Sequence, residues 1–322
     1  MMIMILAKPA DLGVSYLAAA GDRIFIAGYT VSESSPNDRA QWQLYVLENG
    51  VARVIVDALP IPTALIGDGA GGALCGTIEG LWSCTAAAGR RVDERPVSAM
   101  VLDERHVSWA AKGAILQMPL AGGAIEVLHR SADRIRTLAQ HRGALYWIGA
   151  AGELPPPTIL PGNFAILPLD EAPRALIVRP ATGGPPTRTP LAKLPLTEVA
   201  VDDTGVFAVT RGGLPEQFDG HVLRVAHGGS SWDVLATGRK LPSQLRPIPG
   251  GVVWSYEISL GYVVEAFVHG GVVALFERPN AKLKGLTVDG DHLVFAEQRL
   301  ERLPMGGILV TSECRLLSVR LP

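Results

Sequence analysis

A short turn containing a Gly-Gly pair recurs along the chain between β-type runs, and it constrains the fold more than any other feature. The turn ends the segments 119–123, 180–184, 225–229, 267–271 and, less regularly, 304–307. A repeat of this kind indicates many small antiparallel sheets, each of which shares its hydrophobic core with its neighbours. It predicts an architecture and leaves the activity open, because repeat folds host enzymes, sensors and inert scaffolds alike.

Each repeat reads as four strands, A to D, in which a tight turn follows A, a variable loop follows B and the Gly turn follows C. Strand A begins seven times, at 14–17, 62–65, 97–100, 135–138, 196–199, 242–245 and 283–286. Seven units in 322 residues average about 46 residues each, which is the length of a β-propeller blade. The second strand of most units carries an aromatic residue, which we expect to pack between neighbouring sheets.

The sequence therefore predicts an all-β, single-domain, seven-bladed propeller of four-stranded antiparallel blades over residues 1–322. The blades are expected at 14–59, 62–96, 97–134, 135–195, 196–240, 241–279 and 280–322, the last one together with residues 2–8. Residues 314–322 look like a third strand with no fourth strand after it. Residues 2–8 look like an isolated strand, and pairing the two would complete the last sheet and remove an exposed edge.

With these turns and the pair Tyr146-Trp147, the chain resembles seven-bladed β-propellers that are closed by strands from both termini. The repeats are similar to those of bacterial YWTD-like and NHL-like propellers. The resemblance covers the whole chain, but the diagnostic tetrapeptide is reduced here to Tyr146-Trp147. It therefore implies the architecture and no family activity.

Composition excludes several classes of partner. Lys and Arg total 29 against 31 for Asp and Glu, with no run of five like charges, so we expect no nucleic acid. No segment approaches the ~18 apolar residues that span a bilayer, and the apolar start of the chain is too short for a signal peptide. We expect a monomer without a membrane partner.

Three cysteines are too few for a disulfide framework. A turn near Ile78 places Cys75 opposite Trp82 and leaves Cys84 diagonal to it, so these two thiols are not expected to pair. Together with Cys314 they predict reduced thiols in a cytoplasmic protein.

Loop lengths indicate where a function lies. The A–B and C–D turns share one face of the ring and are short, whereas the B–C loops emerge on the opposite face and vary widely. The long ones are 29–41, 149–174, 211–221 and 297–307. Long loops in a compact fold are usually functional or disordered, so we expect the site on the B–C face, with the Pro-rich segment 149–174 as a lid.

The connections from D to the next A place one residue per blade near the mouth of the central channel on that face. These residues are Ser15, Thr63, Ser98, Arg136, Thr197, Ser243 and Lys284. Five hydroxyls and two cations predict a site for a carboxylate or phosphate, with Arg136 as a bidentate donor. Arg211, Tyr256 and Tyr262 are further candidate ligand contacts. The alternative is that Arg136 and Lys284 pair with Glu198 or lie in water.

Signatures of catalysis are sparse. The seven histidines have no metal-binding spacing, and no Gly-x-Ser-x-Gly segment is present, so we predict no metal and no cofactor. Streptogramin lyases are similar in shape, but their His and Glu-x-His set is missing from this sequence. His221 alone lies at the end of a B–C loop, beside Asp219 and Glu216, and is a candidate general base.

The leading hypothesis is a soluble binding propeller that holds a small molecule or a short, possibly modified, peptide on the B–C face. Such a protein would suit an accessory role in a bacterial metabolite pathway. One alternative is a lyase or hydrolase that uses loop residues such as His221, Glu257, Tyr262 or Glu297. Another is a scaffold that binds a partner protein.

Overall fold

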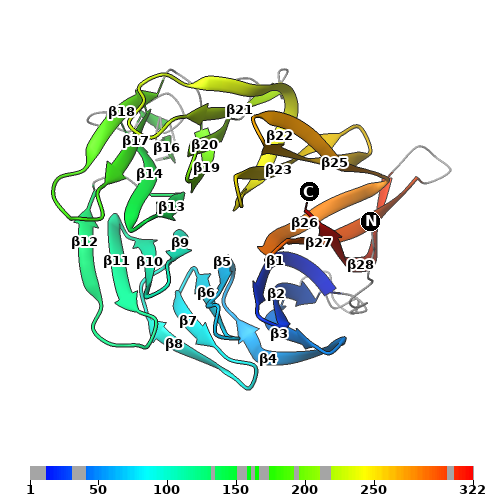
Figure 1. Cartoon of the computed structure of the whole chain (residues 1–322). Coiled ribbons are helices and arrows are strands. Elements are labelled where there is room, and N and C mark those ends of the chain that lie inside the picture. Colours follow the sequence, from blue (N-terminus) through cyan, green and yellow to red (C-terminus); the bar gives the residue numbers. More distant parts are fainter. Residues whose placement is uncertain are drawn as a thin grey trace.

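The computed structural model describes residues 12–30, 41–131, 135–150, 158–160, 164–166, 174–191, 196–210, 219–302 and 308–321. All regular secondary structure in these residues is β-strand. Figure 1 shows the sheets arranged around a common axis, with the chain passing from one sheet to the next around the ring. Over the same residues there is no helix with the length and hydrophobicity needed to cross a membrane.

Three four-stranded antiparallel sheets begin the ring. The first holds β1 (Leu12–Ala20), β2 (Arg23–Thr30), β3 (Gln41–Glu48) and β4 (Val51–Leu59). The second holds β5 (Pro62–Gly67), β6 (Ala73–Thr77), β7 (Gly80–Cys84) and β8 (Gly89–Asp93). The third holds β9 (Ala99–Leu102), β10 (His106–Ala111), β11 (Ala114–Pro119) and β12 (Glu126–Arg130).

The fourth sheet contains an inserted hairpin. Its strands are β13 (Leu138–His141), β14 (Ala144–Ala150), β17 (Arg174–Arg179) and β18 (Thr187–Leu191). Between β14 and β17, the short strands β15 (Thr158–Leu160) and β16 (Phe164–Ile166) pair with each other. The sequence predicts one long loop here and gives no sign of this hairpin.

One strand joins the next two groups of strands into a single sheet. The order is β19 (Leu196–Asp202), β20 (Gly205–Thr210), β21 (Asp219–Val225), β22 (Asp233–Ile248), β23 (Gly251–Ile258), β24 (Gly261–Val268) and β25 (Gly271–Pro279). The first half of β22 pairs with β21 and its second half pairs with β23. Leu241 and Gln244, where the strand changes partners, have positive φ angles of 48° and 57°.

The last described sheet holds β26 (Ala281–Asp289), β27 (His292–Arg302) and β28 (Ile308–Arg320). The sequence predicts a loop from residue 297 onward, and this is wrong for residues 297–302, which continue β27 and pair with β28. The segment 2–8, which is predicted to pair with the last sheet, lies outside the described residues.

Neighbouring sheets pack through their inner strands. The strands β1, β5, β9, β13, β19, β22 and β26 contact one another in that order, and β26 also contacts β1. The first and last described sheets are therefore neighbours, as Figure 1 shows. A hydrophobic cluster that includes Leu17, Ile26 and Leu316 fills the space between them.

The aromatic residues of the second strands form the centre of this packing, as predicted. They are fully buried: Phe25, Trp109, Trp147, Phe207, Trp254 and Phe295. Truncating such a side chain to Ala costs about 3–5 kcal/mol in general, so these contacts contribute strongly to the stability of the ring.

The glycine turns have the backbone geometry that the repeat predicts. His269 and Gly270 both have positive φ, at 52° and 79°, and join β24 to β25 in two residues. Two successive positive φ angles are characteristic of a type I′ hairpin turn, whose twist matches that of the strands. The pair at 306–307 lies outside the described residues.

The expected register of the cysteine hairpin is confirmed. Cys75 pairs with Trp82, whereas Cys84 pairs with Ala73. Both thiols and that of Cys314 are free and buried.

Candidate functional site

A cavity of about 180 Å³ lies beside the two-residue turn between β23 and β24. Residues of β22, β23 and β24 form one side of it, and the beginning of β26 with Leu300 of β27 forms the other. The turn joins the second and third strands of its group, so the cavity is on the face from which the B–C loops emerge. It contains four predicted residues, Ser243, Tyr256, Glu257 and Tyr262.

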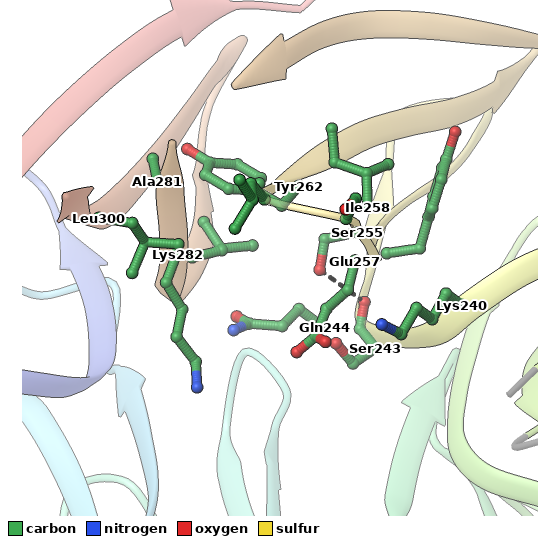
Figure 2. Close-up of a pocket in the computed structure, with 15 residues that line it drawn as sticks. Lys240, Ser243, Gln244, Ser255, Glu257, Ile258, Tyr262, Ala281, Lys282 and Leu300 are labelled. Atoms are coloured by element: carbon green, nitrogen blue, oxygen red, sulfur yellow. Dashed lines mark hydrogen bonds between the residues drawn. The ribbon is translucent and has the colours of Figure 1, made fainter. Parts of the chain in front are cut away.

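Charged groups of both signs line this cavity. Figure 2 shows Lys282 and Lys240 on opposite sides, with Gln244 and Glu257 between them. Lys282 and Glu257 are exposed to solvent. The Lys282 backbone pairs with Gln298, but its ammonium group makes no hydrogen bond or ion pair with the part of the chain that the structure describes. The cavity can therefore present a cation to an incoming group.

Backbone and hydroxyl groups complete the polar lining. The Ser255 hydroxyl donates to the Ser243 carbonyl oxygen at 3.2 Å, which is the dashed line in Figure 2. The Gln244 and Leu245 amides donate to the two carboxylate oxygens of Glu198, at 3.0 and 2.8 Å. These bonds tie β22 to β19 and hold the cavity wall at the point where β22 changes partners.

Two tyrosines close the cavity from the side of the sheet. Tyr262 is 2% exposed, and its hydroxyl donates to Glu297 Oε2 at 2.8 Å. Burial raises the pKa of Tyr262 far above its ordinary value, and the nearby Glu297 charge raises it further. The pKa of Tyr256 is also raised by burial and by Glu265, whose Oε1 lies 3.4 Å from the Tyr256 hydroxyl. Both phenols remain protonated donors near neutral pH.

The structure does not bring the seven mouth residues into one cavity. Ser243 alone lines the cavity, while the hydroxyls of Thr63 and Ser98 donate to carbonyl oxygens of the next sheet, at 2.7 and 2.6 Å. Thr197 donates to the Val209 carbonyl at 3.4 Å. In these positions the hydroxyls link strands, a role that the sequence pattern does not distinguish from ligand binding.

Four of the seven mouth residues lie at register shifts in the inner strands. The pairing slips at Ser15, Thr63, Thr197 and Lys284, which are the bulge residues of β1, β5, β19 and β26. Ser98 instead precedes β9, whose ladder begins two residues later than predicted. The reason is that the neighbouring Val97 amide donates to the Thr77 carbonyl of the previous sheet, at 2.9 Å.

The two predicted cations differ in environment. Arg136 is exposed, whereas Lys284 is half-buried, and burial lowers the pKa of Lys284, with the Lys282 charge lowering it further. Neither pairs with Glu198, which instead binds the β22 amides and has Arg246 at 4.0 Å. Arg211 lies outside the described residues.

The candidate general base is not at the cavity. His221 is on β21, where its amide donates to the Thr210 hydroxyl at 2.9 Å, and its buried Nδ1 has no hydrogen-bond partner among the described groups. Of its predicted neighbours, residue 216 and the side chain of Asp219 lie outside the described part. The residues that the structure describes contain no group of three or more His, Cys, Asp or Glu that could hold a metal ion.

Sequence reasoning missed the cations of the cavity, Lys240 and Lys282. The loop between β23 and β24 has only two residues, so loop length gave no signal there. The one sequence feature that could have indicated these cations is their position, since the segments 240–244 and 281–284 contain the predicted mouth residues Ser243 and Lys284.

Comparison with known proteins gives the fold. Neither a protein-family model nor a curated protein matches the sequence. Among solved structures, the β-propeller domain of the Trilobed protease from Pyrococcus furiosus matches over 95% of both chains, with 10% identity and a TM-score of 0.64. YCF48 from Cyanidioschyzon merolae matches over 98% of both chains, with 9% identity and a TM-score of 0.60. The chain has a β-propeller fold.

A third match has the same architecture. BamB from Moraxella catarrhalis is 15% identical, with 95% of this chain and 85% of that chain covered and a TM-score of 0.53. At these identities the likeness shows the propeller fold alone, so the function has to be argued from the cavity.

Proposed function

We propose that this propeller is a binding protein that holds a small molecule or one end of a short peptide in the cavity beside the β23–β24 turn. The observation that carries the proposal is a concave site on the B–C face with Lys282, Glu257 and serine hydroxyls around an apolar wall. A few polar groups converging on a partly apolar hollow are the usual composition of a ligand site.

The size of the cavity limits the ligand. At about 180 Å³ it is smaller than the ~300 Å³ of typical ligand pockets, so it accepts one residue or a small zwitterion. A cation and a carboxylate in one site suit a group that carries both charges, such as an amino acid or a peptide terminus. Any remaining part of a peptide would lie toward the predicted mouth residues Arg136 and Lys284.

We also propose that the ring has seven blades. In this arrangement β22 is the outer strand of one blade and the inner strand of the next, and residues 2–8 add the fourth strand beside β28. The continuous order of inner-strand contacts from β1 to β26 and back to β1 supports this count.

Calorimetry with single amino acids and dipeptides tests the binding proposal. Lys282→Ala and Glu257→Gln should each weaken binding about 10-fold or more, because a hydrogen bond to a charged group contributes ~1.5–3 kcal/mol. Lys112→Asn and Glu104→Gln, exposed positions on other sheets, are matched controls and should leave the affinity unchanged. An affinity equal to that of the wild type in both Lys282→Ala and Glu257→Gln would contradict the proposal.

A protein-interaction scaffold is the second candidate. The outer strand β4 exposes Val51 and Val54, at 65% and 44%, away from the cavity. Binding of a partner protein that persists in Lys282→Ala and is lost in Val51→Glu would favour the scaffold over the small-ligand site.

A further inference from the structure

A second cavity, of about 350 Å³, lies where the β25–β26 turn meets β27 and β28. Its lining contains the arginines Arg278, Arg299 and Arg315 and one carboxylate, Glu297. Three guanidiniums and one carboxylate give these side chains a formal charge of +2. Such a concentration of arginine around a hollow attracts anions.

Arg278 lies against an aromatic ring, and two of its guanidinium nitrogens lack a hydrogen-bond partner in the part of the chain that the structure describes. Its guanidinium lies 5.8 Å from the centre of the Phe276 ring, and Phe276 stacks on Phe295 at 4.8 Å. Arg278 Nε and Nη2 are buried, and neither has a hydrogen-bond partner among the described groups. These two nitrogens form one edge of the guanidinium plane, which matches the two oxygens of a carboxylate or phosphate.

Glu297 does not fill this role. Its Oε2 lies 3.7 Å from Arg278 Nε, which is too long for a hydrogen bond, and it accepts instead from the Tyr262 hydroxyl at 2.8 Å. Arg299 lies 3.8 Å from Glu301, and both of these side chains are about half exposed. A pair at this distance, between half-exposed side chains, contributes little to stability.

The β25–β26 turn, which lines the cavity, is fixed by backbone hydrogen bonds of Asn280. The Asn280 amide donates to the Leu260 carbonyl at 2.5 Å, and the Leu300 amide donates to the Asn280 carbonyl at 2.8 Å. These bonds join the β25–β26 turn to the β23–β24 turn and to β27. The site is therefore largely formed before any ligand enters.

We infer that this cavity binds a small oxyanion, a phosphate or carboxylate group, between Arg278 and the outer arginines. The Arg278 side chain as a whole is 23% exposed while its Nε and Nη2 are buried, so a small rotation toward the cavity gives these two N–H groups an acceptor. The volume of the cavity is within the range of sites for small organic ligands. A phosphate monoester carries a charge of about −1.5 to −2, which is similar in size and opposite in sign to the charge of the lining side chains. This site uses different charged residues from the one proposed above and does not depend on it.

Calorimetry with inorganic phosphate and, separately, with acetate at constant ionic strength tests the inference and distinguishes the two oxyanions. At least one of the anions should bind, and Arg278→Lys, which keeps the charge but loses the fork, should weaken binding 10-fold or more. Arg299→Gln should also weaken it, whereas Arg90→Gln, an exposed position on β8, is the matched control and should change it less than twofold.

Binding of neither anion, or equal losses in Arg299→Gln and Arg90→Gln, would overturn the inference. If Arg278→Lys fails to fold, Arg299→Gln decides. Lys282→Ala should leave anion affinity unchanged, so failure at this site and failure of the proposed peptide or metabolite site are separate results.

Discussion

At the scale of single residues, one bidentate ion pair with a buried carboxylate joins β22 and β24. Arg239 Nε and Nη2 donate to the two oxygens of Glu265, at 2.9 and 2.8 Å, and the guanidinium lies 5.1 Å from the centre of the Tyr256 ring. Glu265 is 7% exposed and Arg239 is 28% exposed. A carboxylate in this position is stable only while its partner remains.

Removing Arg239 should therefore destabilise the protein more than breaking a surface pair does. We expect Arg239→Ala to lower the free energy of unfolding by about 3 kcal/mol, because it leaves a buried charge unpaired. Arg23→Ala is the matched control, since Arg23 pairs with Glu48 nearer the surface and its loss should destabilise the protein much less. Urea unfolding measures both, and equal losses would contradict the prediction.

The cysteines give a pH-dependent prediction. Burial raises the pKa of Cys84 to about 12 and that of Cys314 to about 11, and it also raises the pKa of Cys75. At pH 8 the folded thiols are protonated and should not react with iodoacetamide, whereas the unfolded chain should react readily.

The same shifts affect stability. The unfolded thiols ionise near pH 8.5, so the unfolded state binds fewer protons than the folded state above that pH. The contribution of these thiols is complete below about pH 8.5 and is lost as the pH rises toward 11 to 12. In the alkylation experiment, a fast reaction of the native protein with iodoacetamide at pH 8 would contradict the burial of these thiols.

Single residues were predictable from sequence where one position repeats. The aromatic residues of the second strands recur in most units, and all six that we place there are buried in the structure. Lys282 and Arg278 were not predicted as site residues. Their importance depends on the meeting of β25, β26 and β27, and a single-unit pattern does not contain that contact.

At the scale of strands, hydroxyl groups connect neighbouring sheets near the axis. The Ser98 hydroxyl donates to the Ile135 carbonyl of the next sheet at 2.6 Å. We expect Ser98→Ala to cost about 1 kcal/mol, because a half-buried carbonyl then loses its donor. Thr187→Val is the control, because the bond of 3.4 Å that its hydroxyl donates to the Val178 carbonyl is exposed and lies within its own sheet. Identical unfolding midpoints for Ser98→Ala and the wild type would show that the bond contributes nothing.

Strand positions followed from the repeat wherever turn residues bound a short run. The sequence could not predict that β27 continues to Arg302 or that β15 pairs with β16, because both depend on the partner strand. The double pairing of β22 was also hidden. It requires the chain to change partners at Leu241 and Gln244, two residues with left-handed backbone angles that their type does not predict.

At the scale of the whole molecule, closure of the ring is the most consequential proposal. Deleting residues 1–9 should lower the free energy of unfolding by at least about 3 kcal/mol if an apolar strand from this segment completes the sheet of β28. Ile3→Asp and Ile5→Asp, which keep the full chain length, should also lower the free energy of unfolding. Unchanged stability in all three variants would exclude the pairing.

The proposed function depends on a ligand that binds on the B–C face beside the β23–β24 turn. Methyl NMR with the amino acids and dipeptides as probes tests it most directly. We expect shift changes confined to the methyl groups around the cavity, those of Ile258, Leu260, Leu283 and Leu300. Changes confined to the opposite face, such as those of Ile24, Leu120 and Val288, would contradict it.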